Sequence, residues 1–424
     1  MIALSWDEVA ALRLGSLEGG GPGDEITGIV ADSRESGPGD LFVALNTGVR
    51  YVDDARATGA FTLVPDDQEA ALAALAGLVR SKAGARVVAV VGSVGKTTTK
   101  DVLGALCAPH VPTIWAERSL NNEIGLPLTV CRLEPETRVL VTEMGMRGPG
   151  QIAYLCEIAR PDVVLVSHIG PEHLEFVGTV EGVAEANAEA IAALPPGGTA
   201  VVPARSSELE PFLGRDDVTV RRFDRSDVEL ADGSARFRVD GEVVELELPF
   251  TQPHLAVNVL AALHAYVALG LPLADARAGV SGIRLSPWRG EETELPGGGL
   301  VVNDAYNANP DSMRAALEHL ATRAPTRRKI AILGEMAELG ESSERYHREI
   351  GELAASLGIE VLGVGEPARA YRPVVWAPDA EAAIEVARGL LAPGDAVLVK
   401  ASRAVALEGI APEIANFARA WFPS

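Results

Sequence analysis

The sequence lacks several features that mark secreted, membrane and zinc-binding proteins. Only three cysteines occur among its 424 residues, at positions 107, 131 and 156, and no two of them form a C-x-x-C pair. A disulfide framework or zinc site is therefore not expected, and the thiols are expected to be small buried groups in a reducing compartment. The N-terminus carries acids where a signal peptide needs bases, and no apolar run approaches membrane-spanning length. We expect a cytoplasmic protein without membrane insertion.

Basic charge is also scarce. The chain has 37 Lys and Arg against 59 Asp and Glu, which gives a net charge of -22. Binding to a phosphate backbone needs basic surface, so no nucleic-acid partner is expected. A hydrophobic content of 47% excludes a mostly disordered chain, and the length predicts two or three domains.

The most informative segment that is present covers residues 86–101, RVVAVVGSVGKTTTKD. An apolar run at 87–91 predicts a buried strand, and a glycine-containing turn leads directly into a helix. Such a turn gathers backbone N–H groups at the positive end of the helix dipole, where phosphates bind. Lys96 would place a charge on these phosphates, and the Thr97 hydroxyl would ligate Mg²⁺. The segment therefore predicts that the chain binds and consumes a nucleoside triphosphate.

This motif departs from the full phosphate-loop pattern G-x-x-x-x-G-K-[ST] at one position. Val90 stands where the first glycine is required. A glycine-bearing turn that binds nothing is the competing interpretation. The order of strand, loop, Lys-Thr and helix favours a nucleotide site.

Three blocks follow one another along the chain, and together they predict an α/β protein with three domains. Residues 1–84 mix short strands at 26–30, 41–45 and 61–64 with a helix at 66–80. In residues 85–290 strands at 87–91, 138–143 and 162–167 alternate with helices, which predicts a parallel sheet, and Asp240-Gly241 marks a hairpin. Residues 291–424 again alternate strand and helix after a Pro/Gly-rich passage at 285–299, as in a small Rossmann-like domain. No G-x-G-x-x-G motif follows a strand in this last block.

Four polar clusters could add chemistry to the phosphate loop, although each also has a structural interpretation. Residues 121–125, NNEIG, are typical of a turn, and 303–310, NDAYNANP, could be helix capping. Glu143 ends a buried strand, where a carboxylate beside a phosphate loop can hold Mg²⁺. His168 and His173 follow another strand end, which favours a site over a hydrogen-bonded turn.

Taken together, these clusters resemble the Mur ligases, the ATP-dependent amide ligases of peptidoglycan precursor synthesis. The resemblance covers nearly the whole chain, from ADSRESGPGDLFVAL at 31–45 through EMGMRGPGQI at 143–152 and HLAVNVLAA at 254–262 to VKASR at 399–403. NDAYNANPDSM at 303–313 and LGEMAELG at 333–340 are most similar to the branch that adds D-alanyl-D-alanine to a UDP-N-acetylmuramoyl-tripeptide.

The resemblance implies a small N-terminal α/β domain for the UDP-substrate (1–84), a central parallel-sheet ATPase domain (85–290), and a C-terminal Rossmann-like domain (291–424) that closes over ATP and the dipeptide. It implies a cytoplasmic monomer that uses ATP and Mg²⁺ for cell-wall synthesis, and so serves cell shape and division. The implied nucleotide contacts are Gly92, Ser93, Gly95, Lys96, Thr97, Thr98, Asn258, Arg289 and Asp304. The implied metal ligands are Thr97, Glu143 and His173, and Lys96, Glu143 and His173 serve catalysis. The implied substrate contacts are Asp32, Ser33, Arg34, Asn121, Asn122, Tyr306, Asn307, Asn309, Lys400, Ser402 and Arg403.

Three positions depart from the family pattern. Asn187 stands where the family carries a lysine that is modified to a carbamate and helps to hold a second Mg²⁺. An amide cannot form a carbamate, and its neutral oxygen is a weaker partner for Mg²⁺. Tyr51-Val52-Asp53-Asp54 replaces the usual D-G-H stretch of the N-terminal domain, and Ala401 replaces a usual glycine.

Two other interpretations stay open at this point. A folylpolyglutamate synthase-like ligase would share the central domain, but the N-terminal block and NDAYNANP argue against it. A non-catalytic nucleotide-binding homologue would tolerate a change such as Asn187. A GTPase switch is not expected, because no Asn-Lys-x-Asp string occurs.

Overall fold

The computed structural model describes residues 1–231 and 234–421, which divide into two compact units. The first unit comprises Met1–Ser167, Glu185–Pro249 and Val257–Arg284. The second comprises His168–Ala184, Phe250–Ala256 and the chain from Leu285 onward. The chain therefore enters the second unit three times, and the domain boundaries at 84/85 and 290/291 stay predictions.

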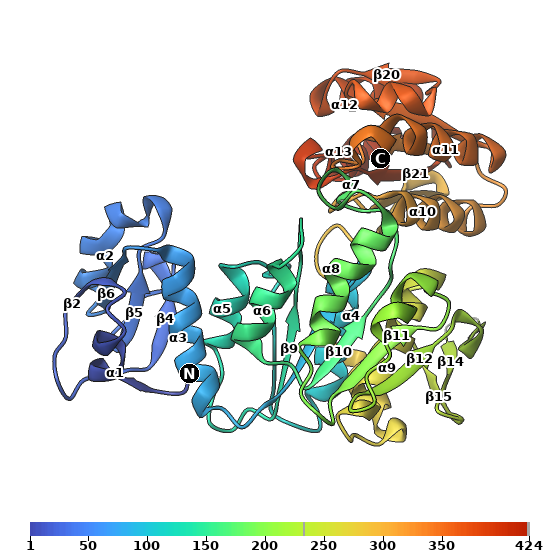
Figure 1. Cartoon of the computed structure of the whole chain (residues 1–424). Helices are drawn as coiled ribbons and strands as arrows, with labels where there is room; N and C mark the ends of the chain where they lie inside the picture. Colours follow the sequence, from blue (N-terminus) through green and yellow to red (C-terminus); the bar gives the residue numbers. More distant parts are fainter. Residues whose placement is uncertain (232–233, 422–424) are drawn as a thin grey trace. The chain divides into compact units, whose positions relative to one another are not determined.

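The first unit begins with a four-stranded sheet of order β2-β6-β5-β4, drawn in blue in Figure 1. Strands β4, β5 and β6 are parallel, and β2 runs antiparallel to β6. The predicted strands and helix of this block are confirmed within a few residues. Arg80 at the end of α3 donates to the carbonyl of Ala159 (2.8 Å), which ties this block to the central sheet. The elements are β1 (Leu4–Ser5), α1 (Trp6–Ala11), β2 (Gly15–Glu18), β3 (Glu25–Ile26), β4 (Gly28–Val30), β5 (Asp40–Val43), α2 (Val52–Ala57), β6 (Phe61–Pro65) and α3 (Gln68–Lys82).

The central sheet has six parallel strands in the order β12-β11-β10-β7-β9-β8. Val87 through Val91 on β7 are fully buried, as expected for a strand covered on both faces. After β7 the chain adds β8 and β9 on one side of this strand, and after β9 it adds β10, β11 and β12 on the other side. The carboxyl ends of β7 and β10 therefore flank a topological switch point, where α/β sheets bind ligands. The strands are β7 (Arg86–Val91), β8 (Thr113–Trp115), β9 (Val139–Glu143), β10 (Val163–Val166), β11 (Thr199–Pro203) and β12 (Thr219–Phe223).

Helices and a small antiparallel sheet complete this block. The helices α4 (Lys96–Cys107), α5 (Gly125–Val130) and α6 (Gln151–Ala159) lie wholly in the first unit. The helices α8 (Val180–Ala192) and α9 (Pro253–Ala268) begin in the second unit and end in the first, and α7 (Leu174–Val177) belongs to the second unit. The antiparallel strands are β13 (Val228–Ala231), β14 (Ser234–Val239) and β15 (Glu242–Leu246). The predicted hairpin turn is confirmed, because Asp240 and Gly241 join β14 to β15 with φ angles of 50° and 87°.

The second unit contains a six-stranded sheet of order β16-β17-β21-β18-β19-β20, parallel except for the edge strand β16. Alternation of strand and helix had predicted this architecture. Strand β16 was missed, because its residues lie in the Pro/Gly-rich passage that was interpreted as a linker. Its elements are β16 (Glu291–Leu295), β17 (Gly299–Asn303), α10 (Pro310–Arg323), β18 (Lys329–Leu333), α11 (Ser343–Ser356), β19 (Ile359–Val364), β20 (Val375–Ala377), α12 (Ala380–Leu390), β21 (Ala396–Lys400) and α13 (Ile410–Ala418).

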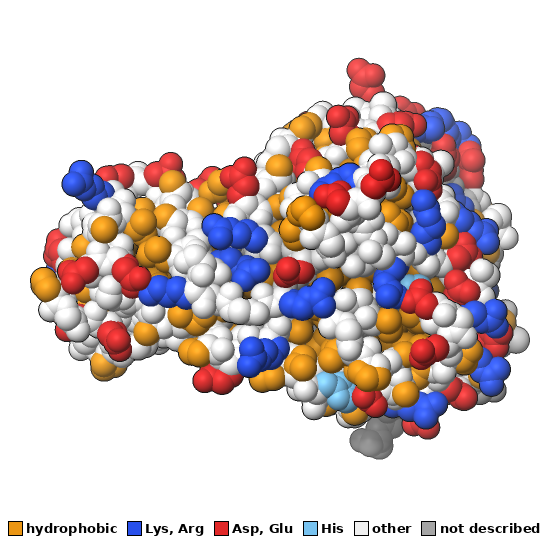
Figure 2. Space-filling model, turned by 60° about the horizontal axis from the view of Figure 1, so that its bottom comes forward, with side chains coloured by type: hydrophobic (Ala, Val, Ile, Leu, Met, Phe, Trp, Pro, Cys, Tyr) orange, Lys and Arg blue, Asp and Glu red, His pale blue; other side chains and the backbone are white. Residues whose placement is uncertain are grey.

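The cysteines and the surface agree with the expectations from composition. Cys107, Cys131 and Cys156 are free and buried, and burial raises the pKa of each thiol to about 12. Acidic and basic side chains are interspersed over the face shown in Figure 2. Within residues 1–231 and 234–421, no helix combines the length and apolar character needed to cross a membrane.

Candidate functional site

The glycine loop after β7 has the conformation that its sequence predicts. Gly92 and Gly95 have φ angles of 120° and 84°, which side chains other than glycine rarely adopt. A Cβ atom on Gly95 would lie 2.5 Å from the Asn258 Oδ1 atom. Glycine is therefore required at Gly95 for both backbone conformation and space, and Asn258 lies directly against the loop.

Helix α4 starts at Lys96 with its N-terminus open. Its N-cap is Gly95, and no side chain accepts a hydrogen bond there. The first N–H groups of a helix have no partner inside the helix, and they lie at the positive end of its dipole. The Lys96 ammonium donates to the carbonyl of Gly92, and Thr97 and Thr98 are buried behind it. This arrangement can bind an anion with backbone N–H groups and one positive charge.

A neighbouring loop is fixed against this helix by a lysine that the sequence analysis missed. Lys100 is fully buried, pairs with Asp101 (2.8 Å), and donates to the carbonyls of Ala116 (2.5 Å) and Arg118 (2.6 Å). The Ser119 hydroxyl consequently lies 3.0 Å from the Thr97 hydroxyl. Lysine side chains are rarely fully buried, so the sequence alone indicates a solvated side chain at position 100. Only the burial of α4 as a whole could have suggested otherwise.

Glu143 lies at the carboxyl end of β9, almost completely buried. Its Oε1 atom accepts from the Asn121 amide (2.7 Å), whereas its Oε2 atom is buried without a hydrogen-bond partner among the described residues. A buried carboxylate oxygen is costly unless it is paired, so the atom fits a cation such as Mg²⁺. No group of three or more His, Cys, Asp or Glu side chains within residues 1–231 and 234–421 could hold a metal by itself.

The paired asparagines before α5 have different roles. Asn121 orients Glu143, as described above. The Asn122 side chain accepts from the backbone N–H of Gly125 (2.9 Å) and so closes the turn before α5. Asn122 therefore closes a turn and Asn121 contacts Glu143, while the assignment of both residues as substrate contacts stays a prediction.

In the second unit, Lys400 is buried and organises the loop after β17. Its ammonium donates to the Asp304 carboxylate (2.6 Å) and to the Asn307 carbonyl (2.9 Å), and 3% of its side chain is exposed. The residue therefore lies between the ends of β21 and β17. This geometry suits a lysine that shapes the loop carrying Asp304 and Asn307.

The loop after β18 is fixed to the same region by three polar side chains. The Ser402 hydroxyl accepts from the N–H of Ala337 (2.8 Å), and the Tyr371 hydroxyl donates to the carbonyl of Gly334 (2.8 Å). The His347 Nε2 atom accepts from the N–H of Met336 (2.9 Å), while its Nδ1 atom bonds the Ser343 carbonyl (2.7 Å). Burial lowers the pKa of His347, which agrees with a neutral imidazole that accepts at Nε2.

The two candidate histidines belong to the second unit. The His173 Nδ1 atom contacts the Glu338 carboxylate, and His173 has a left-handed backbone conformation with a φ of 51°. The His168 Nε2 atom lies 2.9 Å from the Asp311 carboxylate. In the sequence both histidines lie within 85–290, the predicted central domain, whereas residues His168–Ala184 group with the second unit.

The remaining predicted residues of the second unit fall into two groups. Arg289 stacks over the Tyr306 ring at 4.1 Å, and Arg403 stacks over Trp288 and pairs with Glu408 (2.7 Å). Both guanidinium groups therefore lie over aromatic rings, where cation–π attraction holds them. The Asn309 side chain accepts from the N–H of Ser312 (2.9 Å) as the N-cap of α10, as the capping interpretation expects.

The predicted UDP-contact residues form a short exposed turn. The Asp32 carboxylate accepts from the backbone N–H of Arg34 (3.0 Å) and from its guanidinium (2.9 Å), bracketing Ser33. These bonds lower the pKa of Asp32 to about 2. The Arg34 side chain is 86% exposed, so it can reach a ligand.

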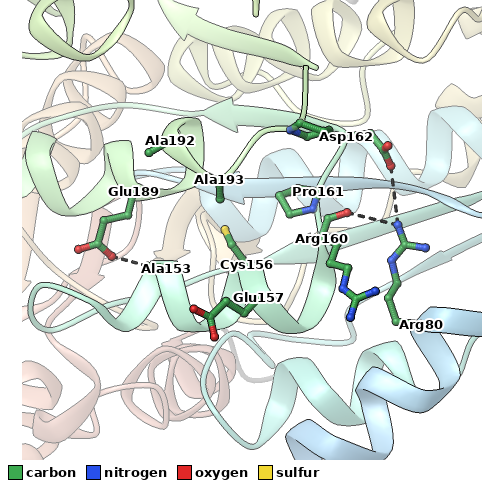
Figure 3. Close-up of a pocket in the computed structure, with 11 residues that line it drawn as sticks. Arg80, Ala153, Cys156, Glu157, Arg160, Pro161, Asp162, Glu189, Ala192 and Ala193 are labelled. Carbon is green, nitrogen blue, oxygen red and sulfur yellow. Dashed lines mark hydrogen bonds and ion pairs between the residues drawn. The ribbon is translucent and has the colours of Figure 1, made fainter. Parts of the chain in front are cut away.

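A pocket of about 750 Å³ lies elsewhere in the first unit, as Figure 3 shows. Arg80, Arg160 and Asp162 line one part of it, and Cys156 and Glu189 line another. Asp162 precedes β10, whose opposite end reaches the glycine loop. None of the predicted site residues lines this pocket.

Comparison with known proteins places this geometry in a family. Residues 90–266 match the Mur ligase middle domain, and residues 288–403 match the Mur ligase glutamate ligase domain. The UDP-N-acetylmuramoyl-tripeptide–D-alanyl-D-alanine ligase of Escherichia coli K12 is 31% identical, over 97% of this chain and 98% of that protein. MurF from Acinetobacter baumannii has a TM-score of 0.84 and 26% identity, over 98% of this chain and 99% of that chain. MurF from Thermotoga maritima in complex with ADP has a TM-score of 0.81 and 29% identity, over 93% of this chain and 98% of that chain.

Proposed function

This chain belongs to the Mur ligase family, and we propose that it joins D-alanyl-D-alanine to a UDP-N-acetylmuramoyl-tripeptide with conversion of ATP to ADP and phosphate. The relationship extends over 97% of the chain, including the N-terminal block that would bind the UDP-substrate. The observation that carries the proposal is the open N-terminus of α4 behind the glycine loop, with Lys96 beside it. That arrangement suits an enzyme that places the γ-phosphate of ATP next to an acceptor.

The chemistry would proceed in two displacements. The terminal carboxylate of the tripeptide attacks the γ-phosphorus, the bond to ADP breaks, and an acyl phosphate forms. The amine of the dipeptide then attacks the acyl carbon, and phosphate leaves with the bonding electrons while the amine loses a proton. The N–H groups of the α4 N-terminus and the Lys96 ammonium would neutralise the phosphate oxygens during the first step.

We propose Mg²⁺ as a cofactor, with Thr97 and Glu143 as its ligands in the first unit. When bound, Mg²⁺ would neutralise charge on the phosphates. The buried, unpartnered Oε2 atom of Glu143 supports this assignment, and the Asn121 amide fixes the carboxylate in place. His173 is proposed as a further ligand, oriented by its contact with Glu338.

The second unit would close over ATP and the dipeptide. Its contribution would come from Arg289, Tyr306, Asn307 and Arg403, while Lys400 and Ser402 shape the loops that present them. Strand β16 occupies residues 291–295, so a hinge within the predicted linker would be confined to residues 285–290. We further propose a cytoplasmic monomer, in keeping with three unpaired thiols.

The decisive experiment combines ATP, Mg²⁺, a UDP-N-acetylmuramoyl-tripeptide and D-alanyl-D-alanine, and detects the pentapeptide product by mass spectrometry. Product formation and ADP release should require both co-substrates. A parallel assay replaces the two peptide substrates by a folate and glutamate, and product there would favour the folylpolyglutamate synthase-like alternative. Nucleotide binding without any product would favour a non-catalytic homologue.

A further inference from the structure

The first amide of the glycine loop is bound by a side chain from a distant helix. The Gly92 N–H donates to the Asn187 Oδ1 atom at 2.7 Å, and both residues are buried. Asn187 lies on α8, 95 positions further along the chain, with 1% of its surface exposed. A buried bond of this kind fixes the orientation of the peptide at the start of the loop.

Two further side chains contact the loop. The Ser167 hydroxyl, at the end of β10, lies 3.0 Å from the Val91 carbonyl and 2.6 Å from the Val94 carbonyl. Asn258 lies against Gly95 at the other end of the loop. Side chains from three separate elements therefore determine where the loop lies, and the open N–H groups of α4 follow directly after it.

Helix α8 offers Asn187 from a rigid position. Two residues along the helix, the Glu189 carboxylate accepts from the N–H groups of Gly150 (2.5 Å) and Ala153 (3.0 Å) at the start of α6. Figure 3 shows Glu189 directed toward Ala153. These two hydrogen bonds hold α8 in place, so the Asn187 amide oxygen is already positioned to accept from the Gly92 N–H.

The amide also has the appropriate charge. A carboxylate at position 187 could accept the same hydrogen bond, but it would place a buried negative charge beside a loop that receives phosphates. Like charges that cannot be solvated repel strongly in a buried environment. A neutral oxygen acceptor fixes the loop without opposing the ligand.

We propose that Asn187 is a positioning residue for nucleotide binding: its amide oxygen holds the Gly92 N–H so that the glycine loop is open for phosphates before the nucleotide arrives. The residue acts through Gly92 and makes no contact with the nucleotide. This inference rests on the proposed function, because it assumes that the loop binds a nucleoside di- or triphosphate. From the family resemblance alone, Asn187 is only the position at which the carbamate-forming lysine is absent.

The test measures the affinity for ADP with Mg²⁺ by calorimetry in the full chain. Asn187→Ala and Asn187→Leu remove the acceptor and should weaken binding about tenfold, the effect of about one buried hydrogen bond. Asn187→Asp keeps an acceptor of the same shape and adds charge, so it should also weaken binding. Glu185→Gln lies on the exposed side of the same helix and should bind ADP like the unchanged chain.

Hydrogen exchange separates positioning from general destabilisation. A peptide that spans residues 88–97 should exchange faster in Asn187→Ala and Asn187→Leu, but should stay protected in Asn187→Asp. In steady-state assays the KM for ATP should rise while the KM for the dipeptide stays unchanged. Wild-type ADP affinity in both Asn187→Ala and Asn187→Leu would overturn the inference. Absence of ADP binding by the unchanged chain would instead overturn the proposed function, and this inference with it.

Discussion

The two six-stranded sheets build ligand-facing loops in opposite ways. In the central sheet, the loop after β7 offers backbone N–H groups and one half-buried lysine, Lys96. In the C-terminal sheet, the loops after β17, β18 and β21 are joined by side chains, with the buried Lys400 among them. The first region therefore presents main-chain N–H groups, whereas the loops of the second region are held together by polar side chains.

This difference separates two roles for a lysine at a strand end. Lys96 follows β7, is half-buried, and donates to the Gly92 carbonyl in its own loop. Lys400 ends β21 and has an ion pair and a further bond to a carbonyl, with little exposure. We therefore expect loss of Lys96 to affect chemistry and loss of Lys400 to affect stability.

The largest effect is expected for Lys96→Ala. Removal of a charge that acts on the transferring phosphoryl group should reduce turnover by about a thousandfold or more. The midpoint of thermal unfolding should change little, because the side chain is only half-buried. Release of ADP with both co-substrates present measures the effect, and Lys82→Ala, a partly exposed lysine paired with Glu8, is the matched control. Unchanged turnover would disprove the assigned phosphate site.

The difference between these two regions also explains which features could be predicted from the sequence alone. A phosphate loop dictates its own sequence, because left-handed glycines and an uncapped helix start leave few alternatives, so Gly92, Gly95 and Lys96 could be predicted to form the loop. The alternation of strand and helix likewise predicted both parallel sheets. Periodicity did not reveal β16, whose residues lie among glycines and prolines at the edge of the sheet.

Long-range polar pairs could not be predicted in this way. The contacts of Asn187 with Gly92, and of Lys400 with Asp304, join residues that are almost a hundred positions apart. Nothing in the local sequence of either partner indicates the other. For the same reason, the sequence placed His173 with the central block, although residues His168–Ala184 pack with the second unit.

The variant Lys400→Met tests the structural role of the buried lysine in the C-terminal sheet. It leaves the Asp304 carboxylate partly buried without its partner, which should cost about 3–5 kcal/mol in the free energy of unfolding. Thermal or urea unfolding followed in the second unit measures this loss, with Lys329→Met on β18 as the control. The double variant Lys400→Met with Asp304→Asn should recover part of the loss. A midpoint equal to that of the unchanged chain would show that Lys400 is not structural.

The pH dependence of stability should contain a contribution from each unit. Burial lowers the pKa of His264 on α9 in the first unit and of His347 on α11 in the second. Because the unfolded state then binds more protons below the unperturbed pKa of about 6.5, these contributions are complete above that pH. They are lost as the pH falls toward the folded-state values, by about 1.4 kcal/mol per unit of pKa depression.

Variants assign these contributions to the two regions. His347→Gln should flatten the decrease in stability on acidification for the second unit, and His264→Gln should do so for the first. Denaturation midpoints measured from pH 7.5 to 5 for the unchanged chain and the two variants give the profiles. Equal slopes in all three proteins would show that neither buried histidine controls the acid response.

The smallest expected effect is that of bicarbonate, for which we expect no change in activity. The measurement tests the role of Asn187 beside the central sheet. The family resemblance implies a carbamate-forming lysine at the position of Asn187, but the amide there cannot capture CO₂, and its oxygen already accepts from Gly92.

Activity in CO₂-depleted buffer should therefore equal activity after bicarbonate is added back, with sodium chloride at the same ionic strength as the control. A second Mg²⁺ should then rest on His173, substrate oxygens and water, and should bind less tightly than it would with a carbamate. Robust stimulation by bicarbonate would contradict this account of Asn187, whereas no ligation under either condition would favour a non-catalytic homologue. The same assay on Glu185→Gln should give the same ratio, since that side chain lies on the exposed face of α8.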